Sequence, residues 1–252
     1  MSTAPRRRAV DALGLIPAAG RATRLGRLPC SKEVYPVGLA PERVASSFAL
    51  ELLRRAGVAR ALVVLRDGKW DIPAYWLDGS AAGVDLAYVV VDDSPSVPAT
   101  LDCAYPFARG ENIALVFPDI VVEPRDALAR VLARLQAGRA EVVLGVVPTD
   151  RPDKADMVEL DRRGCLKAIT IKPARTRLSQ TWAVAAWRPE FSDFLHRYLA
   201  RLPRTGTEIH LSTVLTAALG EGLRIEAEVF PAGSHLDLGT PEDLERMLGR
   251  RR

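Results

Sequence analysis

Six apolar segments rich in valine, isoleucine and alanine recur along the chain, and none of them alternates strictly between apolar and polar positions. They lie at residues 13–17, 61–65, 86–91, 113–117, 141–147 and 182–187. Continuous apolar runs of this kind are typical of strands that are covered on both faces, as in a parallel sheet. The pattern therefore predicts a mostly parallel sheet that lies between helices.

Helical patterns separate these apolar runs. The stretch 41–57 begins with proline, repeats apolar residues at helical spacing and ends with glycine, and the stretch 124–138 has the same design. Proline favours the first turn of a helix, and glycine favours the position just after its last turn. The alternation of strands and helices therefore predicts βαβ units. Three more helices are expected at residues 189–202, at 207–219, and after Thr240, which can serve as an N-cap.

The stretch 157–173 contains two short strand-like segments around an Arg-Gly turn, and a proline follows the second segment. This pattern predicts a small antiparallel insertion. The expected fold is α/β and Rossmann-like, with a mostly parallel sheet flanked by helices. A chain of 252 residues with 48% hydrophobic content can bury a core of the required size. We predict a single domain over residues 1–252, with flexible Arg-rich tails at 1–11 and 250–252.

The net charge of +4 originates in the two ends of the chain. Arginines occupy positions 6–8 and 250–252, and removing these six from the 35 basic residues leaves 29, against 31 acidic residues. No aromatic residues are interleaved with the terminal arginines. Nucleic acid is therefore not an expected partner.

The cysteines and the apolar runs bear on the expected cellular location of the protein. Cys30, Cys103 and Cys165 are odd in number and far apart, which fits neither a disulfide framework nor a clustered zinc site. We therefore expect a reducing, cytoplasmic setting. No apolar run approaches the roughly 20 residues of a membrane span, and the first residues contain no separate apolar signal region. The sequence predicts a soluble protein without a membrane partner.

A strongly basic segment, "LIPAAGRATRLGRLPCSKEVYPVG", starts in the first predicted strand at residue 15. The small residues Ala18, Ala19 and Gly20 leave room for backbone amides to bind phosphate oxygens. Arg24 and Lys32 would add cationic donors to such a cradle. The alternative is a tight turn after the strand, with its arginines in solvent. Spacing alone does not decide between these interpretations, because loops of this composition are common.

Four segments in order along the chain carry a family resemblance. They are "PAAGRATRLG" with "SKEVYPVG", then "FPDIVVEP", "ITIKP" and "HLDLGTPEDLERM". These segments resemble the motifs of sugar-1-phosphate nucleotidyltransferases, especially glucose-1-phosphate thymidylyltransferases and UDP-glucose pyrophosphorylases. The resemblance implies the nucleotide-diphospho-sugar transferase fold. It also implies that a sugar 1-phosphate oxygen attacks the α-phosphorus of a nucleoside triphosphate, with pyrophosphate as the leaving group. The implied substrates are therefore a nucleoside triphosphate and a sugar 1-phosphate.

The resemblance assigns roles to individual residues. Arg24 and Lys32 would hold the triphosphate and the leaving pyrophosphate, and Lys172 would hold the sugar phosphate. Asp119 and Asp237 would be ligands of a Mg²⁺ ion, which prefers carboxylate, phosphate and water oxygens. Without the resemblance, the two aspartates are ordinary strand-end and loop residues, and Lys172 is a surface lysine.

Four departures from the family pattern leave the specificity open: Ala22, Pro118, Ile171 and the Ser96–Pro98 segment. The last of these lies within the stretch "SPSVPATLDCAYPF" (94–107), where relatives carry a turn of small residues for the base and ribose. Base preference therefore rests only on overall similarity and on Ser31 before Lys32, which favour dTTP ahead of UTP. The sequence leaves the sugar and the oligomeric state undefined, and a homo-oligomer remains compatible with it.

Two other functions remain open at this point. The chain could be a nucleotide-binding or regulatory domain that has lost turnover, or a glycosyltransferase of similar fold. The second fits less well, because such enzymes usually carry an Asp-rich metal motif and only Asp119 occurs here. His196, His210 and His235 are expected on the surface of helices or loops. The expected chemistry requires no histidine base, although His235 lies close to Asp237 in the sequence.

Overall fold

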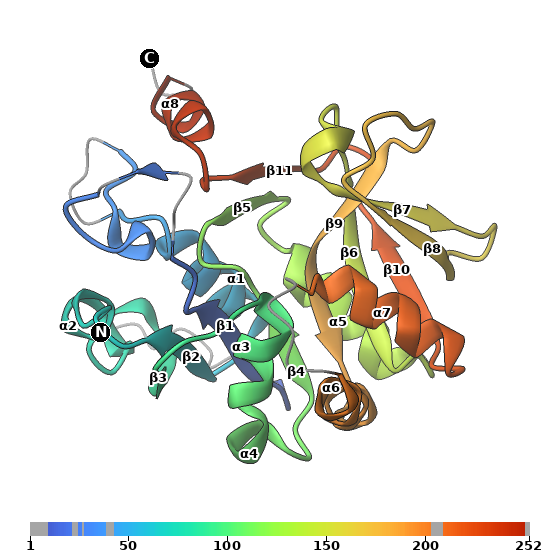
Figure 1. The fold of residues 1–252 in the computed structure, drawn as a ribbon, viewed down its shortest axis with the longest axis horizontal. Helices are drawn as coiled ribbons and strands as arrows, with labels where there is room; N and C mark the ends of the chain where they lie inside the picture. Colours follow the sequence, from blue (N-terminus) through green and yellow to red (C-terminus); the bar gives the residue numbers. More distant parts are fainter. Residues whose placement is uncertain (1–9, 22–24, 27, 39–42, 203–208, 250–252) are drawn as a thin grey trace, which may run out of the picture.

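The computed structural model describes residues 10–21, 25–26, 28–38, 43–202 and 209–249. Over this part of the chain, nine strands form one sheet (Figure 1). Seven of them follow one another across it in the order β10 (Ile225–Val229), β6 (Val142–Pro148), β9 (Gln180–Trp187), β4 (Ile113–Leu115), β1 (Leu13–Ala18), β2 (Arg60–Arg66) and β3 (Asp85–Val91). β9 runs antiparallel to β4 and β6, whereas the other neighbours along this path are parallel. The predicted α/β fold with a mostly parallel sheet is confirmed.

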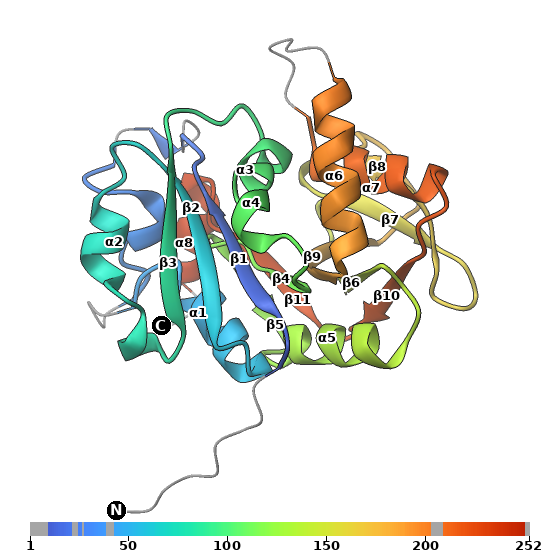
Figure 2. The same cartoon turned by 90° about the horizontal axis from the view of Figure 1, so that it is seen from below.

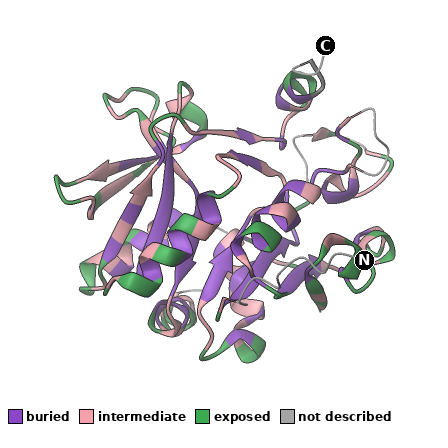
Figure 3. Ribbon diagram, turned by 180° about the vertical axis from the view of Figure 1, so that it is seen from behind, coloured by how far each residue is buried: buried purple, intermediate pink, exposed green. Residues whose placement is uncertain are grey.

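Helices cover the sheet on two sides (Figure 2). One layer contains α1 (Ser47–Ala56) and α5 (Ala127–Ala137). The other contains α3 (Val97–Cys103), α4 (Tyr105–Ala108), α6 (Pro189–Arg201) and α7 (Leu211–Gly220). Figure 3 shows buried residues concentrated on the strands and on the inner faces of these helices.

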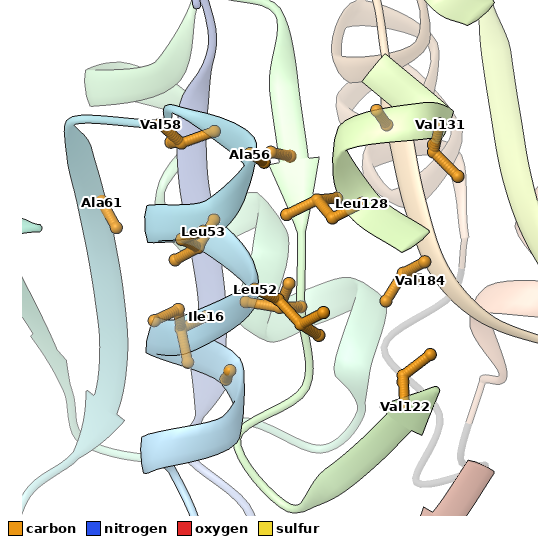
Figure 4. Close-up of a cluster of buried hydrophobic side chains, with 14 of the residues drawn as sticks. Ile16, Leu52, Leu53, Ala56, Val58, Ala61, Val122, Leu128, Val131 and Val184 are labelled. Atoms are coloured by element: carbon orange, nitrogen blue, oxygen red, sulfur yellow. The ribbon is translucent and has the colours of Figure 1, made fainter. Parts of the chain in front are cut away.

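Side chains on the two faces of β1 pack against the two different helix layers. Leu13 and Leu15 pack in the cluster that includes α3, α6 and α7, whereas Ile16 packs with α1 and α5. Figure 4 shows Leu53 of α1 and Leu128 of α5 in the second cluster. Because a strand points successive side chains to opposite faces, a strand buried on both faces must be apolar throughout. This explains the unbroken apolar run in the sequence.

The predicted antiparallel insertion is a hairpin of β7 (Asp156–Leu160) and β8 (Leu166–Ile171). Its turn is held by Asp161, whose carboxylate accepts hydrogen bonds from the backbone amides of Arg163 and Cys165 at 2.8 and 2.9 Å. The hairpin joins the main sheet where Met157 of β7 pairs with Thr181 of β9.

A second, two-stranded sheet does not follow from the sequence pattern. β5 (Ile120–Glu123) and β11 (Ser234–Asp237) pair antiparallel, although more than 100 residues separate them (Figure 1). α8 (Pro241–Gly249) follows β11. Thr240 caps this helix as predicted, since its Oγ1 accepts a hydrogen bond from the backbone amide of Asp243 at 3.3 Å. This small sheet brings the end of the chain beside its middle.

Several predicted element boundaries are wrong. The helix expected at 41–57 begins only at Ser47, because Ala45 bonds to the backbone of Tyr35 and Val44 pairs with Pro36. The strand expected at 113–117 ends at Leu115. The helix expected at 207–219 is described from Leu211, and its predicted start at 207 lies outside the described residues.

The Ser96–Pro98 segment forms the beginning of helix α3. Ser96 is the N-cap of α3, and its side chain accepts a hydrogen bond from the amide of Ala99 at 3.4 Å. Pro98 lies in the first turn, where a missing backbone N–H costs nothing.

Candidate active site

The predicted phosphate cradle lies where β1 ends. Ala18 and Ala19 are buried, whereas Gly20 is exposed. A methyl group added to Gly20 would meet no atom of the described residues within 4 Å, so the space beside it is open. Open α/β sheets place their ligands at this carboxyl edge of the parallel strands. Arg24, the other predicted phosphate ligand of this loop, and Ala22 lie outside the described residues.

Lys32 contacts one of the two predicted metal ligands, Asp119. It begins a short 3-10 helix, η2 (Lys32–Val34), and its Nζ is 2.5 Å from Oδ2 of Asp119. Burial lowers the pKa of Lys32, but the negative charges of Asp119 and Glu33, the hydrogen bond to Asp119 and the charge of Asp237 outweigh it, so that the pKa is raised. The side chain is therefore a protonated ammonium group at neutral pH.

The pairing of β5 with β11 brings Asp119 and Asp237 together. Asp237 lies opposite Ile120 in the register, and the amide of Leu238 donates to the carbonyl of Asp119 at 2.8 Å. The Asp237 carboxylate also accepts a hydrogen bond from the amide of Gly239 at 2.8 Å. The two aspartates, far apart in sequence, are thus neighbours at one end of the small sheet.

Asp119 and Asp237 suit a magnesium ion only if a bound nucleotide also supplies oxygen ligands. In the described part of the chain, no group of three or more acidic, histidine or cysteine side chains could hold a metal ion. Two carboxylates leave most of an octahedral shell to be filled by phosphate and water oxygens, which is usual for Mg²⁺ at nucleotide sites. The donor set therefore fits the predicted ion with its nucleotide rather than the ion alone.

A buried ion pair under the cradle was missed by the sequence analysis. Lys69 Nζ donates to the carbonyl of Ala18 at 2.7 Å and to Glu33 Oε1 at 2.8 Å. Both side chains are almost fully buried, and burial is the main cause of a lowered pKa at Lys69. The only hint of this ion pair in the sequence is that an acidic residue, Glu33, directly follows Lys32. The pair ties the end of β1 to the turn that carries Lys32.

A second anchor holds the residue before Lys32. The backbone amide and the hydroxyl of Ser31 both donate to the carboxylate of Asp71, at 2.5 and 2.7 Å. Asp71 begins α2 (Asp71–Trp76). Ser31, on which the expected preference for dTTP partly rests, thus also has a structural role. Its bonds to Asp71 link the turn that carries Lys32 to the segment after β2.

A cavity of about 640 Å³ lies beside Asp237. Lys172 and Asp237 both line it, so the structure brings the predicted sugar-phosphate ligand to the same cavity as a predicted metal ligand. Lys172 directly follows β8 and has a left-handed backbone, with φ of 40°. This conformation is unfavourable for lysine and costs of order 1–3 kcal/mol, which the surrounding structure must offset.

Ionic contacts hold the cavity wall in place. Arg151, which precedes the 3-10 helix η4 (Pro152–Lys154), contacts Asp243 at 2.5 Å and Glu242 at 3.2 Å in the first turn of α8. Lys154 contacts the same Glu242 at 3.1 Å. Because Asp243 is buried, this network fixes α8 against the loop after β6, along one wall of the cavity.

The histidines agree only partly with the prediction. His196 on α6 is half exposed and contacts Asp102 at 2.9 Å. His235, by contrast, lies on strand β11 and lines the cavity, and its Nδ1 is buried. Burial lowers the pKa of His235, and the nearby Asp150 and Asp243 offset this effect only in part. The loop position expected for this residue is therefore wrong.

Comparison with known proteins agrees with this architecture. Residues 13–249 match the nucleotidyl transferase family, and the chain therefore belongs to it. A curated relative is the low-salt glycan biosynthesis nucleotidyltransferase Agl11 of Haloferax volcanii, which is 21% identical over 236 residues. That match covers 92% of this chain but 63% of the relative, so the chain spans less than two thirds of its length.

Two solved structures share the fold. One, from Bacillus anthracis, is named as a glucose-1-phosphate thymidylyltransferase; it has a TM-score of 0.83 and 18% identity, with 96% of each chain covered. The other is a UDP-glucose pyrophosphorylase from Acinetobacter baumanii, with a TM-score of 0.76 and 17% identity, over 94% of this chain and 91% of that chain. At such identities the likeness establishes the fold and not the substrate. Among the described residues, no helix has the length and apolar character needed to cross a membrane.

Proposed function

We propose that this protein transfers a nucleotide to a sugar 1-phosphate, giving an NDP-sugar and pyrophosphate. The observation that carries the proposal is the ion pair of Lys32 with Asp119, beside Asp237 on β11, together with the open space at Gly20 after β1. Family membership and the cavity that Lys172 shares with Asp237 support it further. The dTTP preference, with UTP second, rests on the resemblance alone.

In the proposed mechanism, the protein supplies positioning and charge and no nucleophile. The backbone at Ala18–Gly20 and the Lys32 ammonium bind the triphosphate and stabilise the charge that builds on the leaving pyrophosphate. Lys172 holds the sugar phosphate so that its oxygen approaches the α-phosphorus in line. Asp119 and Asp237 would hold Mg²⁺, which when bound supplies charge neutralisation at the phosphoryl oxygens. Arg24, which lies outside the described residues, would add a further cation to the triphosphate site.

The decisive experiment is a matrix of the common nucleoside triphosphates against sugar 1-phosphates, with Mg²⁺ present and pyrophosphate release as the readout. Turnover of at least one pair, with dTTP or UTP preferred, is expected. Binding of nucleotides without turnover of any pair would favour a regulatory domain. Transfer of sugar from an NDP-sugar to an acceptor, without pyrophosphate release, would instead favour a glycosyltransferase.

A further inference from the structure

Asp150 is an exposed acidic residue on the wall of the cavity beside Asp237. Within the described part of the chain, no hydrogen bond or ion pair joins its side chain to another residue. Two basic residues of the same wall, Arg151 and Lys154, already contact acidic residues of α8. The proposed function assigns Lys172 to the sugar phosphate and Asp237 to the metal ion, and it leaves Asp150 without a role.

The backbone on both sides of Asp150 is fixed by hydrogen bonds. The amide of Thr149 donates to the carbonyl of Ser179 at 2.9 Å, and the Thr149 hydroxyl accepts a hydrogen bond from the amide of Arg151 at 3.2 Å. The guanidinium group of Arg151 in turn contacts the buried Asp243 at 2.5 Å. The Asp150 side chain takes no part in these bonds, so its carboxylate is held in place and remains available to a ligand.

The carboxylate of Asp150 lies near His235, which lines the same cavity. Burial lowers the pKa of His235, and the negative charge of Asp150 opposes this effect. Such an influence requires the two side chains to be close together. This proximity agrees with a carboxylate on the cavity side of the turn.

A free carboxylate in this cavity suits hydroxyl groups and not phosphate. Two negative charges repel each other, so Asp150 cannot stabilise the phosphate group of a substrate. Its two oxygens are strong hydrogen-bond acceptors, and together they can accept from neighbouring hydroxyl groups of a sugar ring. A cavity of about 640 Å³ has room for a sugar ring as well as a phosphate group.

We propose that the carboxylate of Asp150 accepts hydrogen bonds from hydroxyl groups of the sugar ring and so contributes to the choice of sugar 1-phosphate. This inference rests on the proposed function, because Lys172 must hold the phosphate of the same sugar. Asp150 binds the ring and takes no part in the chemistry at the phosphorus atom.

Two substitutions at Asp150 test the contact. For the best sugar 1-phosphate, we expect KM to rise about 10- to 150-fold in Asp150→Ala, and by a smaller factor in Asp150→Asn, whose amide oxygen still accepts a hydrogen bond. The KM for the nucleoside triphosphate should be unchanged in both variants. The direction of the change is diagnostic, because removing a carboxylate that merely repels the phosphate would leave the sugar-phosphate KM unchanged or lower it. That result would overturn the inference and leave the proposed function standing.

Asp153→Asn is the matched control. Asp153 is also exposed and lines the same cavity, so this variant loses the same charge from the same wall without losing the proposed contact. Its sugar-phosphate KM should not rise. Inorganic phosphate has no ring hydroxyls, so it should inhibit Asp150→Ala at least as strongly as the wild type. An equal rise of KM in Asp153→Asn, or a parallel loss of phosphate inhibition in Asp150→Ala, would show a general effect on the cavity and contradict the contact.

Deoxy sugar 1-phosphates identify the hydroxyl group. In the wild type, the analogue that lacks a contacted hydroxyl should lose a similar factor in kcat/KM, and Asp150→Ala should discriminate against this analogue much less. Equal discrimination by the two proteins against every analogue would overturn the inference.

Binding measurements separate failure of the inference from failure of the proposed function. If the wild type turns over no substrate pair, the proposed function is wrong, and calorimetry with sugar 1-phosphates still compares the wild type with Asp150→Ala. Weaker binding to the variant would support the contact. Equal binding, or none to either protein, would overturn it.

Discussion

Lys32 lies close to acidic residues from the middle and the end of the chain, Asp119 and Asp237, and its raised pKa keeps it charged. Replacing it with alanine should therefore remove a charge-assisted contact to the triphosphate worth about 1.5–3 kcal/mol, which lowers kcat/KM about 10- to 150-fold. Lys167→Ala, at an exposed lysine of β8, is the matched control. Steady-state pyrophosphate release measures both variants, and wild-type turnover by Lys32→Ala would remove Lys32 from the mechanism.

Asp119 and Asp237 should behave as one unit. Each Asp→Asn change should reduce turnover strongly, and the double variant should lose much less than the product of the two single losses, because one metal ion depends on both. Asp85→Asn, at the exposed start of β3, should be neutral. Single-turnover rates of the four proteins test the coupling. Strictly multiplicative losses would show that the two carboxylates do not share a catalytic ion.

Lys172 offers a test that separates binding from backbone strain. Glycine accepts the left-handed φ of 40° that lysine tolerates poorly, so Lys172→Gly should remove the ammonium group without adding strain. The sugar 1-phosphate KM should rise at least about 10-fold, nucleotide affinity should stay the same, and the melting temperature should not fall. A collapse of nucleotide affinity, measured by calorimetry, would contradict the assigned role.

At the scale of elements, the Glu33–Lys69 pair connects β1, η2 and the segment that leads into α2. Removing one partner leaves a buried charge without its counter-ion, so Lys69→Met or Glu33→Leu alone should lower the free energy of unfolding by about 3–5 kcal/mol. The double variant Glu33→Leu with Lys69→Met should be considerably more stable than Lys69→Met alone. Urea unfolding followed by circular dichroism measures this, and simple additivity of the two changes would rule out a coupled pair.

Only some of the helices and strands could be predicted from local sequence patterns. The βαβ alternation and the β7–β8 hairpin were predictable, because each depends on local periodicity and turn residues. The β5–β11 sheet was not, since each strand has only four residues and its partner is more than 100 positions away. The helix α3 at Val97–Cys103 was not predicted, because Ser96 and Pro98 suggest a turn as readily as the start of a helix.

At the scale of the whole molecule, metal binding and nucleotide binding should be linked. Two carboxylates alone bind Mg²⁺ weakly, so calorimetry with Mg²⁺ in the absence of nucleotide should give little heat. Mg²⁺ together with dTTP should raise the melting temperature more than either does alone. Turnover should stop in excess chelator and return when Mg²⁺ is added. Full activity in chelator would exclude a magnesium-dependent reaction.

The sequence by itself determined the class of fold, because a strand buried on both faces must be apolar throughout and the helices between strands must be amphipathic. It also indicated Lys32, Asp119, Lys172 and Asp237, each through its own short motif. The tertiary structure alone decided which of these residues meet. The β5–β11 pairing aligns Asp119 with Asp237, and the buried Lys69 supports the Lys32 turn. Such contacts depend on chain segments far apart in sequence, and no local pattern encodes their distance in space.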